Sequence, residues 1–162
     1  MRYLGIDHGT RRIGLSWGED GLGVAVPLPP ILSPSPWAGL ANVIHEKKID
    51  ALVLGHPFGR ATSWTKQIEC FGERLKKRFA LPVHLVDERL TSRQVEEDLA
   101  AMGRRKNLAK LLRERRSGHV DSRAAVLLLQ DFFDELRLAA ADHSAGTGPV
   151  HGRLLPGEDA VP

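Results

Sequence analysis

The sequence has a single cysteine and no long apolar run, and each scarcity excludes a class of protein. Because Cys70 is the only cysteine among 162 residues, no disulfide can form within the chain, and a reducing compartment is expected. No window approaches the roughly 18 consecutive apolar residues of a transmembrane helix. The start of the chain shows no basic, apolar and small-residue succession typical of a signal peptide. We therefore expect a cytoplasmic protein with no membrane association.

The composition is that of a soluble globular protein, with 42% hydrophobic and 27% charged residues. A chain of 162 residues can build one domain with a proper core, whereas a second domain of ordinary size does not fit. From Ala139 onward, small and polar residues follow without a period. We predict one domain over residues 1–138 and a disordered tail over residues 139–162.

Basic residues are concentrated in the predicted domain. The whole chain has a formal charge of +3 and a pI near 9.3, but residues 1–138 hold 22 basic and 17 acidic residues. The stretch 104–116 carries one acid and seven basic side chains: Arg104, Arg105, Lys106, Lys110, Arg113, Arg115 and Arg116. Such a run is either a solvated basic segment or a surface that contacts nucleic-acid phosphates, and its neighbours favour the second interpretation.

The apolar periodicity predicts an α/β fold. Two short runs at 3–6 and 13–17 form a hairpin, and a proline-containing strand at 23–32 follows as an edge strand. Buried strands are predicted at 51–54 and 83–86, with helices at 37–48, 62–79, 92–102 and 119–136. The expected fold is a mixed five-stranded sheet, in which a three-strand antiparallel meander joins two parallel strands, with helices on its faces.

Acidic residues occur where predicted strands end. Asp7 ends the first strand, Asp87 and Glu88 end the last, and Asp121 lies in the first turn of the last helix. Sites in α/β proteins form at the carboxyl ends of strands, and clustered carboxylates there favour a hard divalent cation such as Mg²⁺ or Mn²⁺. Two such ions can support attack of water on a phosphodiester, so an acidic site beside a basic segment indicates a nuclease. Alternatively, Asp7 only makes a turn.

Four motifs in order resemble one family. They are GIDHGTRRIGLS, GHPFGRA, DERLTS and HVDSRAAVLLLQ, and together they span residues 3 to about 136. The chain thereby resembles the YqgF family of the ribonuclease H-like superfamily. The resemblance implies a nuclease that processes the 5′ end of pre-16S rRNA, or one that resolves Holliday junctions. It also implies catalytic and metal-binding roles for Asp7, Glu88 and Asp121, with Asp87 assisting.

Other motif residues have a functional and a plainer reading. We predict nucleic-acid contacts from five further side chains, namely Thr10, Arg11, Arg12, Arg89 and Arg123, although each of these could equally serve the fold or face solvent. The second motif departs from the family pattern, because His56 stands where leucine is usual.

Three functions compete with the leading one, which is two-metal hydrolysis of a structured rRNA precursor. Cleavage of branched DNA would use the same chemistry and favour a homodimer, because two symmetric cuts are needed. A non-catalytic factor could instead bind RNA on ribosomal precursor particles. The sequence DHGT also resembles the phosphate-binding turn of actin-like ATPases and sugar kinases, but those proteins need two such domains.

Overall fold

A six-stranded mixed sheet forms the centre of the molecule. The computed structural model describes residues 1–88, 121–145 and 153–154, with side chains for 1–88 and 122–142. Its strands are β1 (Arg2–His8), β2 (Arg12–Glu19), β3 (Val24–Leu32), β4 (Ala51–His56), β5 (Val83–Asp87) and β6 (Arg153–Leu154). The predicted helix at 92–102, Arg89 and the basic run 104–116 lie outside the described residues.

The strand order is β3-β2-β1-β4-β5-β6. β1 to β3 pair antiparallel, whereas β1, β4 and β5 are parallel, which confirms the predicted meander and the two parallel strands. β3 lies at one edge of the sheet, as its three prolines require, because proline cannot donate a ladder hydrogen bond.

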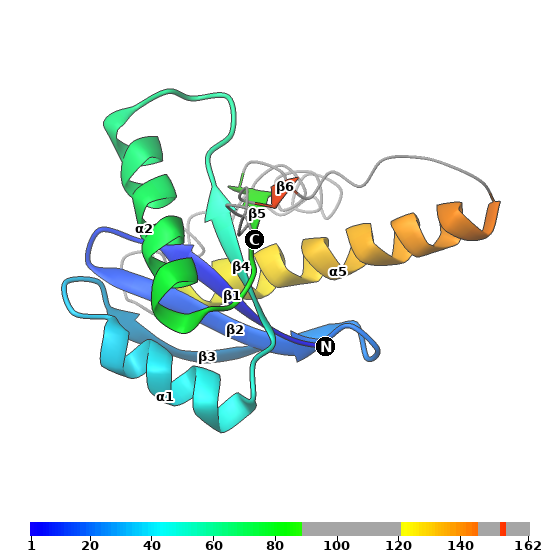
Figure 1. The fold of residues 1–162 in the computed structure, drawn as a ribbon, viewed down its shortest axis with the longest axis horizontal. Helices are drawn as coiled ribbons and strands as arrows, with labels where there is room; N and C mark the ends of the chain where they lie inside the picture. Colours follow the sequence, from blue (N-terminus) through cyan, green and yellow to red (C-terminus); the bar gives the residue numbers. More distant parts are fainter. Residues whose placement is uncertain (89–120, 146–152, 155–162) are drawn as a thin grey trace, which may run out of the picture.

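Helices cover both faces of the sheet. α1 (Trp37–Lys47) and α2 (Ser63–Phe79) lie on one side, and α5 (Asp121–Ala145) lies on the other (Figure 1). The first face buries a cluster that includes Ile6, Leu54 and Leu75. The second face buries a separate cluster that includes Val53 and Phe133. None of the described helices is long and apolar enough to cross a membrane.

Local sequence sets the ends of α2. The helix begins at a capping box, in which the Thr62 side chain accepts from the backbone N–H of Thr65 and the Thr65 side chain accepts from that of Thr62. It ends where Ala80 adopts the left-handed conformation with φ of 51° and donates to the carbonyl of Lys76 over 3.0 Å. These signals confirm the predicted helix at 62–79.

The structure extends beyond the domain boundary predicted at 138. We expected the last helix to end near Leu136 and no regular structure from Ala139, but α5 continues to Ala145. Its last turns need no apolar face, because alanines sustain a helix by intrinsic propensity alone. Residues 153–154 also pair antiparallel with β5 as a sixth strand, which no periodicity in so short a segment could have indicated.

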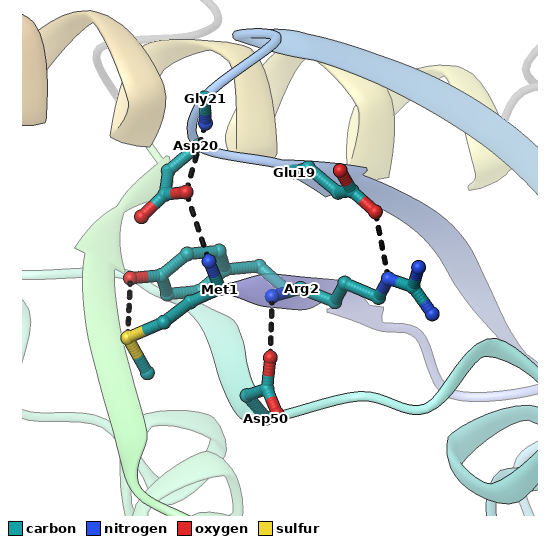
Figure 2. A network of polar contacts seen from close by, with 7 residues as sticks. Met1, Arg2, Glu19, Asp20, Gly21 and Asp50 are labelled. Atoms are coloured by element: carbon teal, nitrogen blue, oxygen red, sulfur yellow. Dashed lines mark hydrogen bonds and ion pairs between the residues drawn. The ribbon is translucent and has the colours of Figure 1, made fainter.

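Polar contacts fasten the start of β1. The amino group of Met1 contacts Asp20 Oδ1 at 3.0 Å, and the Arg2 amide donates to Asp50 Oδ2 over 2.8 Å. Arg2 Nε also pairs with Glu19 Oε1 at 2.6 Å (Figure 2). β1 is thus tied to both of its neighbouring strands at the end opposite Asp7.

Candidate active site

Asp7 lies near the carboxyl end of the central strand β1, on the face that α5 covers. Side chains alternate along a strand, and Tyr3 belongs to the α5-side cluster, so Asp7 shares that face. Its neighbour His8 points to the other face, where its ring packs on Phe71 at a centroid distance of 4.4 Å. Burial there lowers the pKa of His8, so its imidazole is neutral at pH 7 and packs as an aromatic side chain.

A glycine stands beside Asp7 on each neighbouring strand. Asp7 pairs with Gly14 of β2, and the pair Ile6–Leu54 brings the next residue of β4, Gly55, alongside Asp7. No side chain from these two positions shares the face with the half-buried carboxylate. The side chain of Leu128 from α5 packs over Gly55, with carbons 3.5 and 3.6 Å from where a Cβ atom would lie, so Gly55 lets α5 approach the sheet beside Asp7.

Asp87 and Glu88 lie at the same edge of the sheet but are not equivalent. Asp87 pairs with His56 of β4, and alternation from the α5-side residue Val86 places Asp87 on the α2 face. Glu88 is the first residue after β5. Asp87 therefore lies on the opposite face from Asp7, which favours Glu88 over Asp87 as the partner of Asp7.

Two hydrogen bonds fix the beginning of α5 over the sheet. Ser122 Oγ donates to the carbonyl of Leu28 over 2.6 Å, and the buried Ser16 Oγ donates to the carbonyl of Ala125 over 2.7 Å. Leu28 pairs with Leu15, which in turn pairs with Ile6, the residue before Asp7. The first residue of α5, Asp121, therefore starts the helix on the face and at the level of the sheet where Asp7 lies.

Within the described residues, no group of three or more His, Cys, Asp or Glu side chains is arranged to hold a metal ion. The side chain of Asp121 is not among those described, so the predicted set of four acids is not tested as a cluster. Of the predicted nucleic-acid contacts, four are exposed: Thr10, Arg11, Arg12 and Arg123. The others, Arg89 and the seven basic residues of 104–116, are outside the described part of the chain.

A buried histidine at this edge was not expected from the sequence. His56 is 4% exposed, its Nε2 lies 3.0 Å from Glu69 Oε1, and the ring of Phe58 packs on it at 4.3 Å. Histidine in place of the usual leucine is thus still a packed side chain, and it adds a polar link between β4 and α2. His56 and Glu69 are thirteen positions apart in the chain, which gives no local signal from which this pair could be predicted.

Comparison with known proteins identifies the family. Residues 1–135 match the family model described as "RuvX: Holliday junction resolvase". The chain belongs to the RuvX family. This membership confirms the resemblance to the YqgF family that the four motifs indicate.

Relatives in the RuvX family cover most of the chain. A protein of Opitutus terrae named "Putative pre-16S rRNA nuclease" is 44% identical over 142 residues, covering 83% of this chain and 92% of that protein. A protein of the same name from Nitratidesulfovibrio vulgaris is 37% identical over 140 residues, covering 83% and 94%. Family and fold together support a nuclease.

The solved structure of Thermus thermophilus RuvC in complex with a Holliday junction substrate has a related fold. It superposes with a TM-score of 0.52 at 16% identity, covering 96% of this chain and 99% of that chain. At this level of identity the likeness concerns the fold alone. It confirms the predicted ribonuclease H-like class for this RuvX-family chain.

Proposed function

We propose that this protein is a metal-dependent nuclease that hydrolyses phosphodiester bonds of structured RNA and processes the 5′ end of pre-16S rRNA. One observation carries the proposal. Asp7 lies on the α5 face at the carboxyl end of a central strand, between Gly14 and Gly55, close to where α5 begins. A carboxylate in a half-buried position at the carboxyl end of a central strand is suited to binding a cation rather than to packing.

The donor set fits a hard divalent cation. Asp7 and Glu88, together with Asp121 at the start of α5, would offer carboxylate oxygens, whereas Asp87 lies on the opposite face of the sheet and would contribute less. No sulfur ligand lies at this edge, because Cys70 is on the exposed side of α2. When bound, Mg²⁺ or Mn²⁺ would supply an activated water and neutralise charge on the scissile phosphate.

The chain's own residues would bind and orient the nucleic acid. Arg11 and Arg12 are exposed in the turn that follows Asp7, and Arg123 is exposed in the first turn of α5. These guanidinium groups can donate to phosphate oxygens in a forked geometry. Arg89 and the basic run 104–116 would extend this contact. We expect the reaction to take place in the cytoplasm, on ribosomal precursor particles.

A second candidate is resolution of branched DNA. The family model bears the description of a Holliday junction resolvase, and the RuvC structure was solved with such a junction. Because a four-way junction needs two symmetric cuts, this activity would require a homodimer. The same carboxylates would serve in both reactions.

Incubation with two substrates separates these functions. Purified protein would be mixed with a pre-16S rRNA leader fragment or a four-way DNA junction, in Mg²⁺, Mn²⁺ or EDTA. The proposal expects metal-dependent cleavage of the RNA and none in EDTA. Preferred cleavage of the junction would support the second candidate. RNA binding without cleavage under any of these conditions would favour a non-catalytic assembly factor.

A further inference from the structure

Two arginines of α2 stack on one tryptophan of α1. The guanidinium carbon of Arg74 lies 4.6 Å from the ring centroid of Trp37, and that of Arg78 lies 5.2 Å from the same centroid. Trp37 itself packs on Phe71 at 5.6 Å and on Phe79 at 6.4 Å between ring centroids. Cation–π contact with an anchored ring therefore holds both arginines in defined positions where α1 meets α2. In Figure 1 the C-terminal end of α2 lies beside the beginning of α1.

Both guanidinium groups remain available to an anion. Arg74 and Arg78 are exposed, and neither makes a salt bridge in the described part of the chain. A guanidinium that lies on a ring uses its flat face, which leaves its in-plane N–H donors free to contact phosphate oxygens. The two arginines thus expose guanidinium groups to solvent, and the positions of these groups are fixed before an anion binds.

The helix alone does not account for this arrangement. Four cations and no carboxylate occupy residues 74–79, and Arg74 and Arg78 are four residues apart, a spacing at which like charges destabilise a helix. The cations of the last turn, Lys76, Lys77 and Arg78, are favoured by the helix dipole, but Arg74 precedes that turn. An external anion bound to both arginines would offset the repulsion between their positive charges.

The position of the pair on α2 suggests which anion. α2 begins after the loop that follows β4, whose end lies at the candidate active-site edge. α2 covers the face of the sheet opposite to Asp7, so an anion that contacts both the arginine pair and the candidate site has to be a long polyanion. A nucleic-acid duplex, with one phosphate per strand about every 3.4 Å, is such a polyanion.

We propose that Arg74 and Arg78, held on Trp37, bind the phosphate backbone of a double-helical arm of the nucleic-acid substrate, away from the site of cleavage. This arginine platform is distinct from the contacts predicted around Asp7 and in the run 104–116. The inference rests on the proposed function in one respect, namely that the substrate is nucleic acid. It adds a requirement for length, since a short duplex would not reach the platform.

Binding to RNA duplexes of two lengths tests the arginine platform. Fluorescence anisotropy would measure Kd for duplexes of about 6 and about 20 base pairs, at several salt concentrations. Arg74→Ala/Arg78→Ala should weaken binding of the long duplex roughly tenfold and lower the slope of log K against log salt by about 2. Binding and cleavage of the short duplex should stay unchanged.

Three further proteins serve as controls. Lys66→Ala/Lys77→Ala removes the same charge from exposed positions of α2 and should weaken binding less than threefold. Arg74→Lys/Arg78→Lys keeps the charge but loses the fork and should show an intermediate loss with the fold intact. A photoreactive group on Cys70, one turn before Arg74 on α2, should crosslink to the long duplex and not to the short one.

The inference and the proposed function can fail separately. If the wild-type protein binds the long duplex and the Arg74→Ala/Arg78→Ala variant binds it equally well, the platform is wrong and the nuclease proposal is unaffected. Equal losses in the arginine and lysine variants would also overturn it, because they would reflect general charge. If the wild-type protein binds no nucleic acid, the proposed function itself fails.

Discussion

At the scale of single residues, Asp131 of α5 has a carboxylate oxygen, Oδ2, that is buried and has no hydrogen-bond partner in the structure. Burial, followed by the nearby carboxylates Asp134 and Glu135, raises the pKa of Asp131 to about 6. The folded protein therefore binds this proton more tightly than the unfolded chain, so the free energy of unfolding falls as the pH rises from about 4 to about 6.

Replacing Asp131 with asparagine removes this charge. We expect Asp131→Asn to raise the free energy of unfolding at pH 7.5 by about 1 kcal/mol, a figure reduced for partial solvent screening. The gain should vanish below about pH 3, where the carboxyl is neutral in both states. Urea denaturation at the two pH values measures this, with the exposed Asp142→Asn on the same helix as control. Equal effects of Asp131→Asn at both pH values would contradict the assignment.

Gly5 allows α5 to approach β1. A Cβ atom at Gly5 would collide with Ser16 Oγ and would lie 3.0 Å from both the Ala125 carbonyl oxygen and the Cβ of Leu129. Gly5→Ala should therefore lower the free energy of unfolding by about 1–3 kcal/mol, as overpacking does. Thermal unfolding measures the loss. Gly21→Ala is the matched control, since nothing lies within 4 Å of its added Cβ, and it should change stability by less than about 0.5 kcal/mol.

At the scale of elements, the first turn of α5 connects the fold to the candidate site. Ser122→Ala removes the hydrogen bond to Leu28, which should cost about 1 kcal/mol of stability. Because Asp121 precedes Ser122, the loss should also lower kcat roughly tenfold while leaving KM nearly unchanged.

Ser16→Ala is the control for this positioning role. It removes a comparable hydrogen bond to the same helix, but one turn further along, at Ala125. Steady-state cleavage and thermal unfolding should show similar stability losses and a smaller loss of kcat in Ser16→Ala. If the two variants lose kcat equally, the first turn of α5 has no special positioning role.

The sequence predicted those elements whose pattern depends on burial. β4 appears as a continuous apolar run and β5 as an apolar run interrupted only by His84, because both of their faces are covered, and α2 appears through its apolar stripe and its capping box. The last turns of α5 and the short strand β6 bury little, so no hydrophobic period indicated them. The proline-containing β3 was placed correctly at an edge because backbone chemistry requires it.

The candidate site was predicted in part, for a related reason. The positions of Asp7 and Asp87 at strand ends follow from local pattern, but the face on which each lies depends on register. Pairing with Gly14 and proximity to Gly55 place Asp7 on the α5 face, whereas pairing with His56 places Asp87 on the other. Neither the His56–Glu69 pair nor the stacking of Arg74 and Arg78 on Trp37 could be read from the sequence, because both join separate elements.

At the scale of the whole molecule, the proposed function assigns cleavage to one site and substrate binding to a separate surface. The proposed cleavage site would lie at the carboxyl ends of β1 and β5, on the side that α5 covers. Chelation of divalent cations should therefore abolish cleavage and leave much of the affinity for nucleic acid, since the exposed arginines do not depend on the metal. Loss of binding and cleavage together in EDTA would contradict this division.

The most direct test of the central claim is the single-turnover cleavage rate of Asp7→Asn beside that of Asp87→Asn, with Mg²⁺ and the pre-16S leader fragment. The account predicts that Asp7→Asn loses several kcal/mol of transition-state stabilisation, roughly a thousandfold or more in rate, while its fold and RNA affinity are retained. Asp87→Asn, on the opposite face of the same edge, should lose much less. A cleavage rate for Asp7→Asn equal to that of the wild-type protein would contradict the claim that this carboxylate is the centre of the active site.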